Sequence, residues 1–371
     1  MERSYRPKPL KQSPRSRIVA LMGPVGLTER IVQRLMAILL LSVLAGTAGW
    51  LPSQAASVDE QAYLTAHGRL EQELAHLTRS TGGTVGIAAI HIESGRRVSL
   101  HGGERFPMAS TYKVPIAVQL LTRVEKGEVR LDQMVEVKAS DLHLGTGTLT
   151  GLLNQPGVIL SVRNLLELML VVSDNSATDL LLRLAGGPEA VTSRLRELGI
   201  TGIDVSRSTL QMIADRSGFD LPPEEDWTLE TLQNLETKAS DDSRRAARRR
   251  FEADRRDTST PDAMVLLLER IYHGSLLKPE TTDLLLGIMS RCRTGEGRLK
   301  GLLPPKTAVA HKTGTFAGSV VDDVGILTLP DGGGHVAVAV FMKSPEADDA
   351  ESERAIAHIS RAIYDFFLFH P

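Results

Sequence analysis

Hydrophobic residues recur with two different periods along this chain, and each period predicts a different kind of element. Between residues 58 and 78 they return every three or four positions after the candidate N-cap Ser57, a pattern that predicts a helix. Residues 84–92 and 97–100 are instead rich in β-branched side chains and flank a short turn at residues 93–95. Two such runs joined by a turn that contains glycine predict an antiparallel hairpin.

Helical spacing fills the middle of the chain, and strand-like runs return near its end. The expected helices begin near Ser110 and cover residues 162–172, 177–185, 189–198, 263–272, 280–289 and about 351–367; the expected strands cover 308–312, 320–329 and 335–341. Strands at both ends of a chain with helices between them predict an α/β (α+β) fold with one sheet. We therefore expect a sheet-containing part from residues 57–105 and 263–371, and a helical part from residues 106–262.

A strongly charged segment, residues 215–257, interrupts this order. It contains the acidic run 222–226 and a basic run at 244–250, and this pattern predicts an exposed helix or a partly mobile insertion. A nucleic-acid-binding patch is the weaker alternative. Residues 57–371 hold 35 basic and 43 acidic side chains, and such an acidic body argues against a nucleic-acid partner.

Residues 1–56 have the composition of a secretory signal peptide. Eight basic residues precede an uncharged apolar run at 35–51, and small residues follow at Ser53 and Ala55. This order predicts cleavage after Ala55 or Ala56 and export to the periplasm or the medium. The alternative is an uncleaved anchor, which would then be the only contact with a membrane. The lone Cys292 allows no internal disulfide and is interpreted as a small buried side chain rather than a reactive thiol.

Three short motifs carry the candidate chemistry. Ser110 and Lys113 stand three residues apart, so a helix would place them one turn apart on the same face. An amine there could take the hydroxyl proton, which a serine must lose before it attacks a carbonyl. Alone, such a pair is more often a helix cap followed by a solvated charge. Ser173-Asp-Asn175, at the end of an expected helix, and Lys312-Thr-Gly314, on an expected strand, accompany it here.

The order of these three motifs resembles that of class A β-lactamases and penicillin-binding proteins. Further stretches extend the resemblance over nearly all of residues 58–370, namely 105–114, 173–177, 186–188, 257–261 and 324–326. Residues 298–304 and 310–315 resemble the extended-spectrum and Bacteroides-type branch. The resemblance implies a β-lactamase/transpeptidase-like fold, with an antiparallel sheet flanked by helices and an all-helical subdomain.

The resemblance also implies a role for each motif residue. Ser110 would attack the β-lactam carbonyl, Lys113 would be its base, and Ser173 would relay a proton to the departing nitrogen. Burial and the like charge of Lys312 should lower the pKa of Lys113. The remaining roles are an oxyanion hole from the backbone N–H groups of Ser110 and Thr315, carboxylate binding by Lys312 and Thr313, side-chain amide binding by Asn175, and close approach of the strand to the ligand at Gly314. Arg298 would bind the substrate carboxylate or form a surface salt bridge.

One position departs from the family pattern. Class A enzymes use a glutamate to activate the water that releases the acyl group, and alignment of the flanking residues places Thr209 there. A threonine hydroxyl is not a base near neutral pH. Ile213 stands near the place of an asparagine that commonly holds the water. Deacylation would then be slow, or a carboxylate of the insertion (Asp215, Glu224, Glu225 or Asp226) would replace the glutamate.

The sequence therefore predicts a serine β-lactamase that is acylated at Ser110 and hydrolyses the β-lactam amide bond, with slow deacylation as an open outcome. The alternative is a penicillin-binding protein: a D,D-peptidase-like enzyme acting on cell-wall peptide ends, or a non-hydrolysing β-lactam sensor or trap. A non-catalytic domain is the weakest reading, because the motif residues are retained. The ten histidines show no metal-ligand spacing, so we expect no metal and no organic cofactor. We also expect a monomer.

Overall fold

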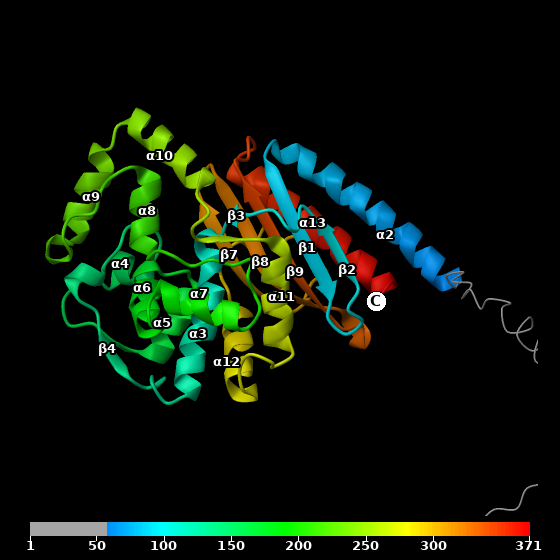
Figure 1. The fold of residues 1–371 in the computed structure, drawn as a ribbon, viewed down its shortest axis with the longest axis horizontal. Helices are drawn as coiled ribbons and strands as arrows, with labels where there is room; N and C mark the ends of the chain where they lie inside the picture. The colour runs from blue at the N-terminus through cyan, green and yellow to red at the C-terminus, as the bar shows by residue number, and fades with distance from the viewer. Residues whose placement is uncertain (1–57) are drawn as a thin grey trace, which may run out of the picture. The chain divides into compact units, whose positions relative to one another are not determined.

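A five-stranded antiparallel sheet carries the fold in this computed structural model, which describes residues 58–371 (Figure 1). Its strand order is β2-β1-β9-β8-β7. The strands are β1 (Thr84–His91), β2 (Arg97–Leu100), β7 (Val309–Phe316), β8 (Val320–Thr328) and β9 (His335–Lys343). The N-terminal hairpin joins the C-terminal strands through β1 and β9, where Ala88 pairs with Ala339. The predicted single sheet, built from both ends of the chain, is confirmed.

Helices cover both faces of this sheet. The alternation of side chains along β1 sends Ile87 and Ala89 into one hydrophobic core and Ala88 and Ile90 into the other. The first core lies under α2 (Val58–Leu77) and α13 (Asp349–Phe369), and the second includes residues of α11 (Pro261–Tyr272) and α12 (Pro279–Met289). Because both faces are covered, β1, β8 and β9 are buried along almost their whole length.

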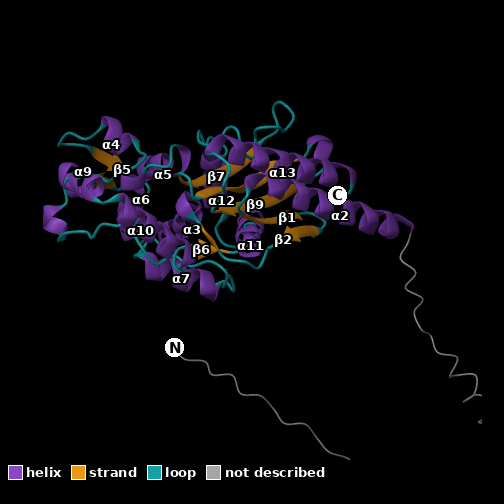
Figure 2. Ribbon diagram, turned by 90° about the horizontal axis from the view of Figure 1, so that it is seen from above, coloured by secondary structure: helices purple, strands orange, loops and turns teal. Residues whose placement is uncertain are grey.

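The chain leaves the sheet after β2 and forms most of its helices before it returns at β7. These helices are α3 (Lys113–Glu125), α4 (Thr148–Leu152), α5 (Val162–Val171), α6 (Asn175–Leu184), α7 (Pro188–Glu197), α8 (Thr209–Ser217), α9 (Leu229–Lys238) and α10 (Asp241–Ala253). Short strand pairs β3 (Phe106–Pro107) with β6 (Thr258–Ser259) and β4 (Met134–Glu136) with β5 (Ile159–Ser161) brace them. Figure 2 shows α4, α5, α6, α9 and α10 gathered at one end of the molecule, with the sheet at the other.

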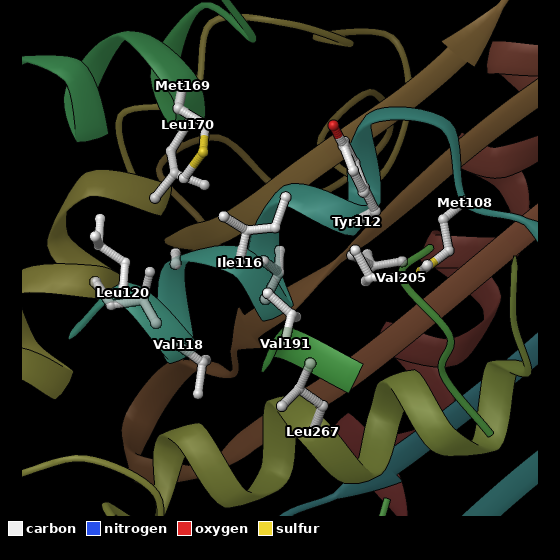
Figure 3. Packing of buried hydrophobic residues seen from close by; sticks show 14 of the residues in the cluster. Met108, Tyr112, Ile116, Val118, Leu120, Met169, Leu170, Val191, Val205 and Leu267 are labelled. Atoms are coloured by element: carbon white, nitrogen blue, oxygen red, sulfur yellow. The ribbon is translucent and has the colours of Figure 1, made fainter. Parts of the chain in front are cut away.

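Helix α3 is the buried centre of the helical part. Its residues from Lys113 to Val118 are all buried. In Figure 3, Ile116 and Leu120 of α3 lie among Leu170 of α5 and Leu267 of α11. The helix is thus held from several sides, and this fixes the turn that precedes it.

One local expectation needs correction. Ser110 does not open an α-helix: it lies in a 3₁₀ turn, η2 (Ala109–Tyr112), and α3 starts at Lys113. The charged insertion follows the first of its two expected forms, because it folds into the largely exposed helices α9 and α10, which pack onto α8 through a few buried side chains. Leu210 and Leu232 form a small core there with Leu144, and partly buried Trp227 packs against it.

The described residues include no helix with the length and apolarity that crossing a membrane requires. The predicted signal segment lies outside the described residues. The proposed boundaries between the sheet-containing and helical parts, at 105/106 and 262/263, stay predictions.

Candidate active site

A cavity of 330 Å³ brings together residues from distant parts of the chain. Ser110, Asn175, Thr209 and Thr315 all line it. A larger hollow of 460 Å³ lies beside Asp215, and none of the predicted catalytic side chains lines it. The smaller cavity is therefore the candidate active site.

Ser110 is presented by a strained turn. Ala109, the preceding residue, has a φ of 41°, in the left-handed region that costs an L-residue roughly 1–2 kcal/mol. The turn is held by the carbonyl of Met108, which accepts hydrogen bonds from the Thr111 N–H at 2.9 Å and the Thr111 hydroxyl at 2.7 Å. Strain that is held in this way is typical of functional sites.

Lys113 is fully buried next to this turn. Its Nζ donates hydrogen bonds to the Ser173 carbonyl at 2.7 Å, to Ser173 Oγ at 3.1 Å and to Asn175 Oδ1 at 3.0 Å. Burial, and secondly the charge of Lys312, hold the pKa of Lys113 well below its usual value. This agrees with the direction expected from the sequence. A lowered pKa increases the fraction of the amine that is neutral, and the neutral form is the one that can accept a proton.

Ser173 lies between the two lysines. Its Oγ accepts a hydrogen bond from Lys312 Nζ at 2.9 Å as well as the one from Lys113. Ser173 has a φ of 59°, and the next residue, Asp174, caps α6 by accepting from the Ala177 N–H at 2.8 Å. Burial lowers the pKa of Lys312 to about 8, although nearby anionic groups oppose this shift. The hydroxyl is placed to pass a proton between an amine and a bound group.

Strand β7 passes directly beside the Ser110 turn. A Cβ on Gly314 would lie 2.5 Å from the Met108 carbonyl oxygen, so only glycine permits this approach. In the structure Gly314 lets β7 approach the backbone of the turn that carries Ser110, and close approach of the strand to a ligand at Gly314 stays a prediction. Thr315 follows on the cavity wall, and Thr313 is buried with 4% of its surface exposed.

Asn175 also lines the cavity, but its amide is already oriented by the protein. Its Oδ1 accepts from Lys113, and its Nδ2 donates to the Leu144 carbonyl at 3.1 Å. The neighbouring loop is close, because a Cβ on Gly145 would lie 2.8 Å from Nδ2. The predicted contact of Asn175 with a substrate amide stays a prediction.

Arg298 lies behind β7 rather than on the surface. Its guanidinium donates to the carbonyls of Gly314 at 3.0 Å and Asp322 at 2.8 Å, and to Thr315 Oγ1 at 2.7 Å. Only 4% of the residue is exposed, although it also pairs with the partly exposed Glu353. Arg298 thus forms the salt bridge considered from the sequence, but its guanidinium is buried rather than on the surface. Arg298 holds β7 in place, and direct binding of a substrate carboxylate stays a prediction.

Comparison with known proteins identifies the family. The family model described as "Beta-lactamase enzyme family" matches residues 69–367. The chain belongs to this family. A β-lactamase from Bacteroides uniformis is 30% identical over 304 residues, which cover 80% of this chain and 90% of that protein.

Two further similarities agree with the class A assignment. The extended-spectrum β-lactamase PER-1 of Pseudomonas aeruginosa is 30% identical over 305 residues, covering 81% of this chain and 87% of that protein. The solved structure of an ancestral class A β-lactamase has a TM-score of 0.65 and 29% identity, covering 80% of this chain and 99% of the other. The resemblance to class A enzymes and the expected fold class are confirmed.

Thr209 occupies a rigid position in this β-lactamase family member. Its N–H and that of Leu210 donate to the carboxylate of Asp179 at 2.7 and 3.1 Å, and its hydroxyl is hydrogen-bonded to the Tyr112 hydroxyl. Burial alone would raise the pKa of Asp179, but the hydrogen bonds from His143, Thr209 and Leu210 lower it below its usual value. The anion at the start of α8 thus pins Thr209 against the cavity.

The four carboxylates suggested as replacements for the glutamate lie elsewhere. Asp215 is bound to Arg207 at 2.7 Å and Gln211 at 2.7 Å beside the larger hollow. Residues 224–226 form the exposed 3₁₀ turn η4. Sequence reasoning missed Glu236 of α9, the one carboxylate among the described residues that line the cavity. No motif marks it, because only the folding of α9 towards Ser217 brings it there.

Residues 58–371 contain no group of three His, Cys, Asp or Glu side chains that could hold a metal ion. The expectation that no cofactor takes part stays a prediction.

Proposed function

We infer that this protein is a serine β-lactamase, which is acylated at Ser110 and hydrolyses the amide bond of the β-lactam ring. The observation that carries this inference is a buried lysine with a lowered pKa, Lys113, which is hydrogen-bonded to Ser173 next to the cavity that Ser110 lines. Family membership supports the same reaction class. The relatives in the comparison are named as β-lactamases.

Acylation needs one proton to travel from the nucleophile to the leaving group. Neutral Lys113 takes the Ser110 hydroxyl proton while Oγ bonds to the lactam carbonyl carbon. Collapse of the tetrahedral intermediate breaks the C–N bond, and Ser173 passes a proton, replaced from Lys113, to the nitrogen. Backbone N–H groups of Ser110 and Thr315 would hold the oxyanion, and each such donor typically contributes about 2.7–4 kcal/mol.

Deacylation is the step that the site supports less well. Thr209 offers a hydroxyl, which cannot take a proton from water near pH 7, and Asp215 is held by Arg207 at another hollow. Glu236 lines the cavity but accepts a hydrogen bond from the Ser217 hydroxyl at 3.4 Å. This observation favours slow release of the acyl group. At its limit it favours the second candidate function, a penicillin-binding protein or trap that stays acylated.

Intact-mass spectrometry over time after mixing with benzylpenicillin distinguishes these outcomes. A slow β-lactamase gives an adduct on Ser110 that decays to free protein while nitrocefin is turned over in steady state. A persistent adduct with a single burst would establish the second function instead. The Ser110→Ala variant is the control and should show neither adduct nor turnover, and an unmodified mass for the wild type would refute both functions.

A further inference from the structure

The loop after α12 covers the outer side of β7, the edge strand that carries the substrate-binding motif. Alternate residues of β7 share a face, so His311, Thr313 and Thr315 point the same way. Two of them are hydrogen-bonded to the loop, Thr313 to Thr294 and Thr315 to Arg298, and His311 lowers the pKa of the Cys292 thiol in the same loop. The loop after α12 thus supports β7 at alternate residues. Cys292 lies in this loop, and the proposed mechanism gives it no role.

Thr294 connects the Cys292 thiol to the Thr313 hydroxyl. Cys292 Sγ lies 3.3 Å from Thr294 Oγ1, and Thr294 Oγ1 lies 2.6 Å from Thr313 Oγ1. Each hydroxyl has one proton to donate, so the two hydrogen bonds share a direction. If Thr294 donates to the sulfur, Thr313 donates to Thr294; if Thr294 donates to Thr313, the Thr313 proton is free to point elsewhere.

His311 provides the charge that decides between these directions. Its Nδ1 is 2.9 Å from both oxygens of Asp323, and its buried Nε2 has no hydrogen-bond partner in the described structure. Lys312 and the Lys300 ammonium, which donates to the Cys292 carbonyl at 3.1 Å, are the other charges nearby. Burial opposes ionisation of Cys292, but His311 and then Lys312 overcome it and lower the pKa of the thiol to about 6. Asp323 raises the pKa of His311 to about 9 against the effect of its burial.

We propose that Cys292 is a positioning residue for the substrate carboxylate: as a thiolate it draws the Thr294 proton, and through it the Thr313 proton, away from the ligand. A thiolate is a strong acceptor and a thiol is a weak one, so protonation of Cys292 lets the chain of hydroxyls reverse. The proposal rests on the proposed function, which assigns the Thr313 hydroxyl to the substrate carboxylate.

Linkage makes this competition measurable. If the Thr313 hydroxyl donates its hydrogen bond to the carboxylate, the Thr294 hydroxyl donates to Thr313 Oγ1 instead of to the sulfur. The sulfur then loses its hydrogen bond, and the thiol form of Cys292 becomes favoured. Ligand binding must then raise the pKa of Cys292, and ionisation of Cys292 must weaken binding by the same factor. A shift of one pH unit corresponds to a tenfold change in affinity.

The test uses the Ser110→Ala variant, which binds without acylation, labelled with [3-¹³C]cysteine. The chain has a single cysteine, so one resonance reports the thiol titration. We expect benzylpenicillin to raise its midpoint by about one pH unit or more, and the methyl ester of benzylpenicillin, which lacks the carboxylate, to leave it unchanged. Adding Thr294→Val should abolish the shift while the free protein still titrates, because His311 remains.

Calorimetry on the same samples separates the two hypotheses. Binding of benzylpenicillin without a midpoint shift, or an equal shift with the ester, would overturn the role of Cys292 and leave the proposed function standing. Absence of any benzylpenicillin binding would count against the proposed function itself. In Cys292→Ala, the pH dependence of binding between about pH 5 and 7 should disappear, which gives an independent check without labelling.

Discussion

Two residues next to the cavity, Ala109 and Ser173, have positive φ angles although neither is glycine. Each conformation is disfavoured for an L-residue, and each is held by neighbouring hydrogen bonds, those of Met108 with Thr111 and of Asp174 with Ala177. As a result, the Ser110 turn lines the cavity and Ser173 Oγ lies between two lysines. At this scale, chemistry depends on where single side chains are held and on how burial changes their protonation.

The Lys312 charge should set the alkaline limit of activity. Its pKa of about 8 means that the ammonium, which would bind the substrate carboxylate, is present below that pH and lost above it. We expect kcat/KM for benzylpenicillin to fall about tenfold per pH unit above pH 8. Lys312→Arg keeps the charge at all these pH values and should remove the decline. A pH profile in which both proteins decline alike would contradict this assignment.

A carboxylate introduced at position 209, the expected place of the family glutamate, should speed deacylation. General-base catalysis contributes about 10²–10⁴-fold, so we expect the Ser110 acyl-enzyme of Thr209→Glu to decay at least about 100 times faster than that of the wild type. Thr209→Gln has the same size without a base and should leave the decay slow. Time-resolved intact-mass spectrometry measures all three rates. Equal decay in the Glu and Gln variants would mean that the water is activated from elsewhere.

At the scale of elements, the two ends of the long segment between α7 and α11 are joined by an ion pair between Arg207 and Asp257. Arg207 Nε donates to Asp257 Oδ2 at 2.6 Å, and Asp257 Oδ1 accepts from the Ser206 and Arg207 N–H groups. Phe251 of α10 packs edge-to-face on Phe316 at the end of β7. The segment between α7 and α11 therefore forms one side of the cavity, and the ion pair holds its two ends next to each other.

Removing the Arg207–Asp257 ion pair should destabilise the fold. Arg207→Met leaves the buried Asp257 carboxylate without its partner, and such a change typically costs about 3–5 kcal/mol of unfolding free energy. Arg245→Met is the matched control, because its pair with Asp242 is exposed and should contribute less than about 1 kcal/mol. Urea denaturation of both variants measures the difference. Similar urea midpoints for the Arg207→Met and Arg245→Met variants would show that the Arg207–Asp257 pair does not stabilise the fold.

On the scale of the whole molecule, the sheet joins residues that are far apart in sequence, and the cavity lies where β7 meets the helical part. Ser110 lies soon after β2 and Thr315 lies on β7, at opposite ends of the helical segment between these strands, and both line one cavity. Every substrate-facing group thus depends on the packing of both parts. A monomer would contain the complete cavity, and light scattering of the purified protein would check the expected monomeric state.

We propose that the protein is exported and that residues 1–56 are removed. Expression of the full chain in a Gram-negative host should give mature protein in the periplasm that begins at Ala56 or Ser57. Leu40→Arg interrupts the apolar run and should leave uncleaved precursor in the cell. Cell fractionation and N-terminal sequencing measure both results. Uncleaved full-length protein in the membrane fraction would support the anchor instead.

Much of the fold and of the candidate site could be predicted, since the signals lie close together in the chain. Runs of β-branched and apolar residues marked β1 and β9, helical spacing marked α5 and α11, and each motif needs only a few neighbouring residues. Ser110, Lys113, Ser173 and Lys312 could be named for this reason. The 3₁₀ turn at Ser110 could not be predicted, because its strained backbone is held by the hydrogen bonds of the Met108 carbonyl and by β7, which lies beside the turn.

The sequence by itself determined the order of the elements and the three motifs, and it predicted Thr209 in place of the family glutamate, since these depend on residue type and local spacing. Only the tertiary structure decided the surroundings of these residues. It placed Glu236 in the cavity wall, Asp215 at another hollow, Arg298 behind β7 and Cys292 beside His311. The physical reason is that burial and charge act through space, so the protonation and orientation of a side chain depend on neighbours that the folded chain brings together.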